Sequence, residues 1–142
     1  MDKITRQSVL DLLYGDWAEY VARIRDLPPA AQAAFLEQQG YKRLADLLAH
    51  IVAWWEEGMQ AIRRYKKDPA ARQPEIDVDG FNARAVEKAR TLSEAEEIRI
   101  FEKTRCDFIE LVQGLSEDDF KDERVLTQIK WELVNHLADH RI

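Results

Sequence analysis

The sequence predicts an all-α protein, an up-down-type four-helix bundle in which residues 1–142 form a single domain. Two observations predict this fold. Apolar residues recur at three- and four-residue steps along most of the chain, which is typical of amphipathic helices and not of strands. The four prolines and three of the five glycines, Gly40, Gly80 and Gly114, fall between these stretches or at their ends. Four helices with modest connections pack most simply as a bundle.

The first half of the chain should contain two long helices. The first is expected over residues 5–26, and the pair Pro28-Pro29 ends it, because a residue before proline disfavours helical backbone. A short helical piece over residues 30–38 leads to a turn at Gly40. The second long helix is expected over residues 41–65, with leucine, isoleucine and tryptophan on one face.

The second half should contain two more helices. Residues 68–80 include two prolines and are expected to form a surface loop, and a third helical region begins at Phe81. It should break near residues 91–93, because Ser93 and Glu96 have the spacing of a capping box, and then continue to Gly114. Residues 116–119 predict a short capped turn, and the fourth helix is expected from residue 127 to the end.

Composition and charge narrow the class of function. Hydrophobic residues make up 46% of the chain and charged residues 34%, a balance typical of folded proteins. The formal net charge of −6 argues against a nucleic-acid partner, because phosphates require a basic surface. The basic run at residues 63–67 falls at the expected end of a helix, where cations complement the helix dipole.

Cysteine content and hydropathy indicate a cytoplasmic protein. The single cysteine, Cys106, excludes an internal disulfide, suits a reducing compartment, and is expected to be buried near Phe108 and Ile109. The first residues lack the apolar core of a signal peptide. No stretch approaches the ~20 apolar residues of a membrane span, so no contact with a membrane is expected.

The positions of the three histidines indicate a candidate metal site. His136 and His140 are four residues apart on the expected fourth helix, so about 40° separates them and both can ligate one metal ion. Such a pair alone is often simply solvated. His50, however, flanks the apolar face of the second helix beside Leu47 and Trp54, so it can point into a groove between helices. Three imidazoles with an open position are typical of catalytic metal sites, and they suit zinc, nickel, iron or copper.

Several acids lie close to these histidines in the sequence. Asp46 and Glu132 stand four residues before His50 and His136, so each is within helical reach as a hydrogen-bond acceptor that orients a ligand. Both could equally be ordinary exposed acids. Catalytic residues stay unassigned, although Asp139, Glu132 and Glu57 lie within one turn of ligands. Trp54, one turn from His50, is expected to form a pocket wall.

Two segments carry a resemblance to a known family. Leu-Leu-Ala-His-Ile-Val-Ala-Trp-Trp at residues 47–55 and His-Leu-Ala-Asp-His at residues 136–140 resemble the DinB-like superfamily of bacterial helical bundles. That superfamily takes one histidine from its second helix and an H-x-x-x-H pair from its fourth. Asp-Gly-Phe-Asn at residues 79–82 is similar to the DfsB/ClbS-related branch. The resemblance covers nearly the whole chain in helix order and spacing.

The resemblance implies a divalent transition metal (zinc, nickel or iron) held by His50, His136 and His140 at one end of the bundle, often in a homodimer. Characterised members include transferases that use low-molecular-weight thiols, a metal-dependent isomerase, and resistance proteins that act on reactive natural products. His140 falls in the last turn of the expected fourth helix, which should fray because its final carbonyls lack partners.

Three hypotheses of function follow. The leading one is a metal-dependent enzyme of the thiol S-transferase or hydrolase type, in which the metal acts as a Lewis acid on a small electrophilic metabolite. The second is a non-catalytic bundle, related to natural-product resistance proteins, that sequesters a small hydrophobic molecule in a tryptophan-lined groove. The third is a helical bundle that acts through oligomerisation.

Overall fold

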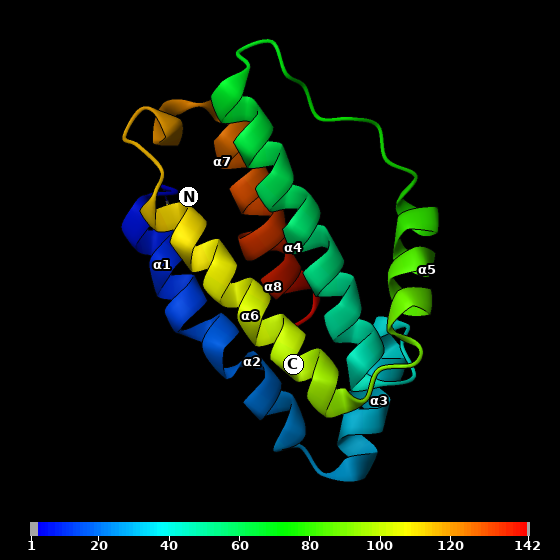
Figure 1. Ribbon diagram of the computed structural model, residues 1–142. Coiled ribbons are helices and arrows are strands. Elements are labelled where there is room, and N and C mark those ends of the chain that lie inside the picture. Colours follow the sequence, from blue (N-terminus) through cyan, green and yellow to red (C-terminus); the bar gives the residue numbers. More distant parts are fainter. Residues whose placement is uncertain (1–2, 142) are drawn as a thin grey trace.

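The computed structural model describes residues 3–141, and every regular element in that range is a helix (Figure 1). The all-α prediction is therefore confirmed. In chain order the elements are α1 (Arg6–Tyr14), α2 (Asp16–Arg25), α3 (Pro29–Gln39), α4 (Leu44–Lys67), α5 (Val78–Ala89), α6 (Glu94–Gln113), the 3₁₀ turn Asp119–Lys121, α7 (Glu123–Ile129), the π-helix Lys130–Asn135 and α8 (His136–Asp139).

The long helices pack around a shared core. α6 lies between α4 on one side and the pair α1 and α2 on the other, while α5 and α7 border α4 (Figure 1). No helix within residues 3–141 has both the length and the apolar composition that crossing a membrane requires. The up-down four-helix type and the single-domain organisation stay predictions.

Aromatic side chains from three helices fill the centre of the core. Trp17 of α2, Trp55 of α4 and Phe101 of α6 are fully buried. The rings of Trp17 and Trp55 meet edge to face, with centroids 4.8 Å apart and planes at 83°, and Trp55 stacks on Phe101 at 5.2 Å. Because aromatic rings bury large apolar areas, this cluster contributes strongly to the free energy that holds the three helices together.

The two buried indoles also hold the C-terminal helical segment. The Nε1–H of Trp17 donates to the backbone oxygen of Leu133 at 3.0 Å, and that of Trp55 donates to the backbone oxygen of Glu132 at 2.8 Å. Both carbonyls belong to the π-helix Lys130–Asn135. Single π turns are wider than α turns and occur frequently at functional sites. This one leads directly into His136 and fixes where α8 begins.

The N-terminal segment forms two helices, so the single helix predicted over residues 5–26 is wrong. The break falls at Gly15, whose φ of −100° and ψ of −99° are not helical. A Cβ at Gly15 would lie 2.7 Å from the backbone oxygen of Asp11, so glycine permits this conformation. The apolar pattern continues through the break and therefore does not reveal it.

The start of α5 differs from the prediction, whereas that of α6 agrees with it. Ser93 and Glu96 form the expected capping box before α6. α5 begins at Val78 and not at Phe81, because the Asp77 side chain accepts the backbone N–H of Gly80 and caps the helix earlier. The expected loop is therefore shorter, and α5 reaches further along α4.

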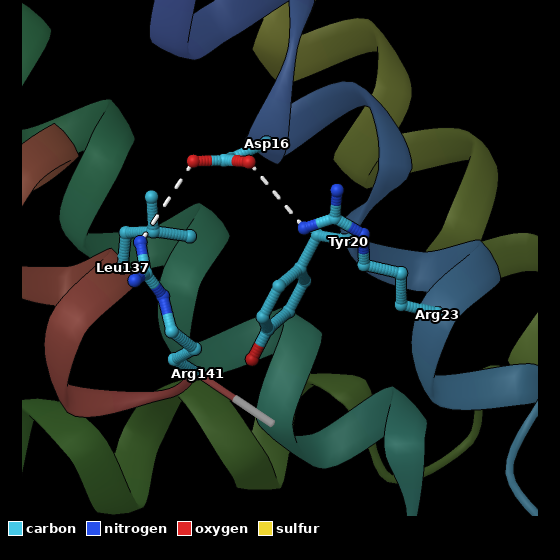
Figure 2. Close-up of a pocket in the computed structure, with 5 residues that line it drawn as sticks. All are labelled: Asp16, Tyr20, Arg23, Leu137 and Arg141. Atoms are coloured by element: carbon cyan, nitrogen blue, oxygen red, sulfur yellow. Dashed lines mark hydrogen bonds and ion pairs between the residues drawn. The ribbon is translucent and has the colours of Figure 1, made fainter.

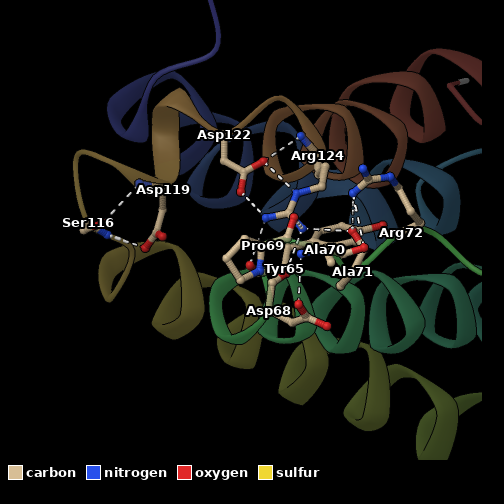
Figure 3. Close-up of polar contacts among 10 residues, drawn as sticks. All are labelled: Tyr65, Asp68, Pro69, Ala70, Ala71, Arg72, Ser116, Asp119, Asp122 and Arg124. Atoms are coloured by element: carbon tan, nitrogen blue, oxygen red, sulfur yellow. Dashed lines mark hydrogen bonds and ion pairs between the residues drawn. The ribbon is translucent and has the colours of Figure 1, made fainter.

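Arg124 sets the start of the last helical segment and ties it to the end of α4 (Figure 3). The segment begins at Glu123 and not at Thr127, because Asp122 caps it and pairs with Arg124 at 2.7 Å. The last carbonyls of a helix lack partners within the helix, and at the end of α4 the Arg124 guanidinium donates hydrogen bonds to such carbonyls. At 2.9–3.2 Å it donates to the backbone oxygens of Tyr65, Asp68, Pro69 and Ala71.

The connection before this segment contains the capped turn that the sequence predicts. The backbone N–H of Ser116 donates to Asp119 Oδ2 at 2.8 Å, and the N–H of Asp119 donates to Ser116 Oγ at 3.0 Å (Figure 3). The basic run of residues 63–67 lies in the last turns of α4, as expected, with Arg64, Lys66 and Lys67 near its C-terminus.

Cys106 is exposed, so the prediction of a buried thiol is wrong. It stands two residues before the buried Phe108, and two residues turn an α-helix by about 200°, which places the thiol on the outer face. A dithiobis-nitrobenzoate reagent should therefore titrate this thiol in the native protein at nearly the rate seen in urea. Cys106→Ser provides the blank. A native reaction that is slower by orders of magnitude would contradict the exposed position.

Candidate metal centre

The structure brings all three histidines together. His50 comes from the second turn of α4, His136 from the start of α8 and His140 from the position that ends α8. One nitrogen of each ring lies within 4.8 Å of the corresponding nitrogens of the other two. Nε2 of His50 and Nε2 of His140 lie 3.1 Å apart. The predicted meeting of the three imidazoles is confirmed, and their role as metal ligands stays a prediction.

Two of the rings are fixed by side-chain amides that the sequence analysis missed. Nδ1 of His50 lies 3.0 Å from Oδ1 of Asn82 on α5, and Nδ1 of His140 lies 2.6 Å from Oε1 of Gln39 on α3. Because an amide oxygen accepts, each ring donates its Nδ1–H and keeps a lone pair on Nε2. The two lone pairs then face each other at 3.1 Å, an arrangement that a cation between them would relieve.

Asn82 has a second donor, which anchors it. The indole Nε1–H of Trp54 donates to the same Oδ1 at 2.6 Å, and the Trp54 ring packs on Phe81 with centroids 4.2 Å apart. α5 is thereby attached to α4 directly beside His50. Metal-binding histidines usually donate their other N–H to an oxygen acceptor in this way.

The two acids expected to orient the ligands behave differently. Asp46 does not contact His50, because it pairs with Arg43 at 2.7 Å. Glu132 is buried beside His136, with Oε1 3.8 Å from Nδ1 of that ring. Within residues 3–141, no group makes a hydrogen bond with this buried Nδ1. Three converging imidazoles are the arrangement expected of residues that could hold a metal ion.

Burial keeps the three imidazoles in their neutral, ligating form. It lowers the pKa of His50 to about 4, with a further lowering from His140 and a smaller rise from the Asn82 hydrogen bond. Burial also lowers the pKa of His136 to about 3, assisted by the other two histidines. The pKa of His140 falls for the same first reason. Protons therefore do not compete for these nitrogens near neutral pH.

Glu132 shows the opposite shift. Burial raises its pKa to about 8, and the hydrogen bond that Gln128 donates to Oε2 at 2.6 Å partly opposes the rise. A raised pKa beside a cluster of candidate ligands is typical of functional sites.

The triad opens into a pocket of about 600 Å³ between α4, α5 and the last helical segment. Trp54 forms part of its wall, as the sequence predicts, and Trp131 is 42% exposed. The lining also includes Asp139 and Glu132, whereas Glu57 is absent from it and contacts Arg64 at 3.3 Å. The residues that line it are Tyr41, His50, Trp54, Gln73, Val78, Asn82, Gln128, Trp131, Glu132, Asn135, His136, Asp139 and His140.

The last turn is tied to the rest of the bundle, and one of its final carbonyls, that of His140, has a partner that the sequence does not predict. The phenol of Tyr20 donates to the backbone oxygen of His140 at 2.8 Å, and Gln39 holds its ring from the other side. Figure 2 shows Tyr20 among the residues on the outer side of this turn, where Asp16 lies between Arg23 and Arg141 at 3.3 and 3.8 Å. His140 therefore has a fixed position despite ending α8.

The chain matches no protein-family model, no curated protein and no solved structure.

Proposed function

We propose that this protein is a DinB-like four-helix bundle and a metal-dependent enzyme that acts on a small electrophilic metabolite. Three neutral imidazoles that converge at the base of an open pocket carry the proposal, because catalytic metal sites combine three protein ligands with a position open to substrate. His50, His136 and His140 would hold a divalent transition metal such as zinc, nickel or iron. The motifs at residues 47–55 and 136–140 support the family assignment.

The reaction is a thiol S-transfer or a hydrolysis. When bound, the metal supplies Lewis-acid chemistry. The chain's own residues fix the ligands and shape the pocket: Asn82 and Gln39 hold two of the rings, and Trp54 and Trp131 offer apolar surface to a substrate. A low-molecular-weight thiol is the proposed co-substrate, and the protein is proposed to be a cytoplasmic homodimer. No residue is assigned as general base.

A second candidate function is sequestration of a small hydrophobic molecule without turnover. The specific observation in its favour is the apolar surface at the pocket, where Val78 is 53% and Trp131 42% exposed. Exposed aromatic rings beside a cavity are typical of ligand sites. In this case the ligand would rest against the tryptophans, and the histidines would not act on it.

The two functions differ in whether the metal accepts an exchangeable ligand. For the cobalt(II)-loaded protein, we expect 2-mercaptoethanol to change the visible absorption spectrum, whereas 2-methoxyethanol, which has no thiol, should leave it unchanged. With a thiol and an activated aryl halide, the metal-loaded enzyme should form several equivalents of thioether per chain. Binding of the aryl compound with an unresponsive cobalt spectrum and no product would favour sequestration. A wild-type chain that binds no divalent ion would contradict the enzyme proposal.

A further inference from the structure

Glu132 is a buried acid, and the burial of its carboxyl group costs free energy of folding. Glu132 is 3% exposed, and within residues 3–141 its carboxyl group has one hydrogen-bond partner, Gln128, which donates to Oε2 at 2.6 Å. Burial of a carboxyl group without full pairing disfavours folding. Stability alone therefore gives no reason for an acid at this position in the pocket wall.

Gly58 on α4 makes room for this carboxyl group. A Cβ at position 58 would lie 2.5 Å from both Cγ and Oε2 of Glu132, so a larger residue would displace the acid. Glycine inside a helix weakens that helix. The chain thus combines a weak helix former and a buried acid at a single contact, and both are explained if the carboxyl group must stand beside the triad.

The Nδ1 atoms of the three histidines indicate a role for the Glu132 carboxyl group as a hydrogen-bond acceptor. His50 and His140 each have a side-chain oxygen acceptor for Nδ1, and His136 is the remaining member of the triad. Oε1 of Glu132 lies 3.8 Å from Nδ1 of His136, about 1 Å beyond hydrogen-bond distance. The backbone oxygen of Glu132 accepts the indole N–H of Trp55, and its interaction with the His136 ring is the smallest of the influences on the pKa of that ring. The carboxyl group is therefore the side-chain acceptor placed for Nδ1.

We propose that Glu132 positions His136 for metal binding, by accepting its Nδ1–H and directing Nε2 toward the nitrogens of His50 and His140. This inference rests on the proposed function, since it concerns how the triad holds its ion. A carboxylate in this role fixes the ring and raises its basicity, and it also offsets the charge of a divalent ion among three neutral ligands. In this role Glu132 acts through His136 and not on the ion, so it is a positioning residue.

Zinc titration against a competing chelator tests the proposal with the full chain. Glu132→Ala should weaken zinc affinity about 10- to 100-fold, the usual effect of losing such an acceptor. Glu132→Gln should have the same effect, because its amide oxygen takes the hydrogen bond from Gln128 and its NH2 group, which cannot accept, then faces Nδ1 of His136. The melting temperature of metal-free Glu132→Gln should equal or exceed that of the wild type, because the amide keeps its contact with Gln128 and removes a buried acid. A purely structural role would instead lower stability and affinity together, and that result would overturn the proposal.

Glu57→Gln is the matched control, since it removes a neighbouring acid that lies outside the pocket lining. Its zinc affinity should stay within about twofold of the wild type, well short of the effect expected for a lost acceptor. If wild type binds zinc and Glu132→Gln binds it equally well, this inference fails and the proposed function stands. If wild type binds no zinc, both fail. The cobalt(II) spectrum gives a second readout, because a reoriented His136 should shift it in Glu132→Gln and not in Glu57→Gln.

Discussion

Replacement of any one of His50, His136 or His140 by alanine should remove most of the divalent metal that the purified protein retains. Each variant loses one of three converging ligands, and two imidazoles hold an ion far less tightly than three. These are also the chain's only histidines, so no other imidazole can substitute in protein without a histidine tag. Elemental analysis should find about one ion per wild-type chain, as expected for a single three-histidine site, and nearly none in the variants.

Asn135→Ala is the matched control for this series. Asn135 lines the same pocket but makes no hydrogen bond with the three rings in the part of the chain that the structure describes. It should retain its metal. Circular dichroism should show unchanged helix content in all four variants, because α4 and α8 keep their core contacts. Full stoichiometry in all three histidine variants would rule out the site.

Trp55→Ala should cause the largest loss of stability of any single change in the core, about 3–5 kcal/mol. The side chain is fully buried between Trp17 and Phe101, and its indole N–H satisfies the backbone oxygen of Glu132. Alanine would leave a cavity at this junction and an unpaired carbonyl in the π-helix. Urea unfolding of the metal-free protein measures the effect without a contribution from metal binding.

Two further tryptophan variants separate the contributions. Trp131→Ala, at a position that is 42% exposed, should cost less than about 1 kcal/mol. Trp55→Phe keeps a buried ring and removes the hydrogen bond, so it should cost about 1–3 kcal/mol. Equal destabilisation by Trp55→Ala and Trp131→Ala would show that Trp55 is not at the centre of the core.

Much of the candidate site can be predicted from sequence, because its ligands obey short-range helix geometry. His136 and His140 share a face through the four-residue step, and His50 flanks an apolar face that its own helix reveals. The acceptors are harder to predict. Asn82 and Gln39 lie 32 and 101 residues from the histidines they contact, and only tertiary packing brings them there. Asn82 falls within the Asp-Gly-Phe-Asn segment that carries the family resemblance, whereas nothing in the sequence marks Gln39.

The differences in the fold have local causes that periodicity does not detect. Gly15 breaks the first helix while the apolar pattern continues on both sides. Asp77 and Asp122 start helices earlier than the apolar residues suggest, because capping depends on a side-chain oxygen and not on hydrophobicity. The apolar neighbours of Cys106 predict a buried thiol, but Phe108, two residues away, faces the opposite side of the helix.

The π-helix before His136 also limits which insertions and deletions the gene can tolerate. A π turn contains one more residue than an α turn. Loss of one residue within Lys130–Asn135 would let the segment close as an ordinary α-helix. Because the π turn carries the one extra residue, His136 and His140 would then keep nearly the same facing toward His50. Loss of one residue between His136 and His140 would instead rotate His140 by about 100° about the helix axis, away from His136, while the core of α2, α4 and α6 would keep its contacts. A deletion in the exposed loop before α5 would also leave the three rings aligned. Some deletions would therefore preserve both fold and site, whereas a deletion between His136 and His140 would preserve the fold and remove the site.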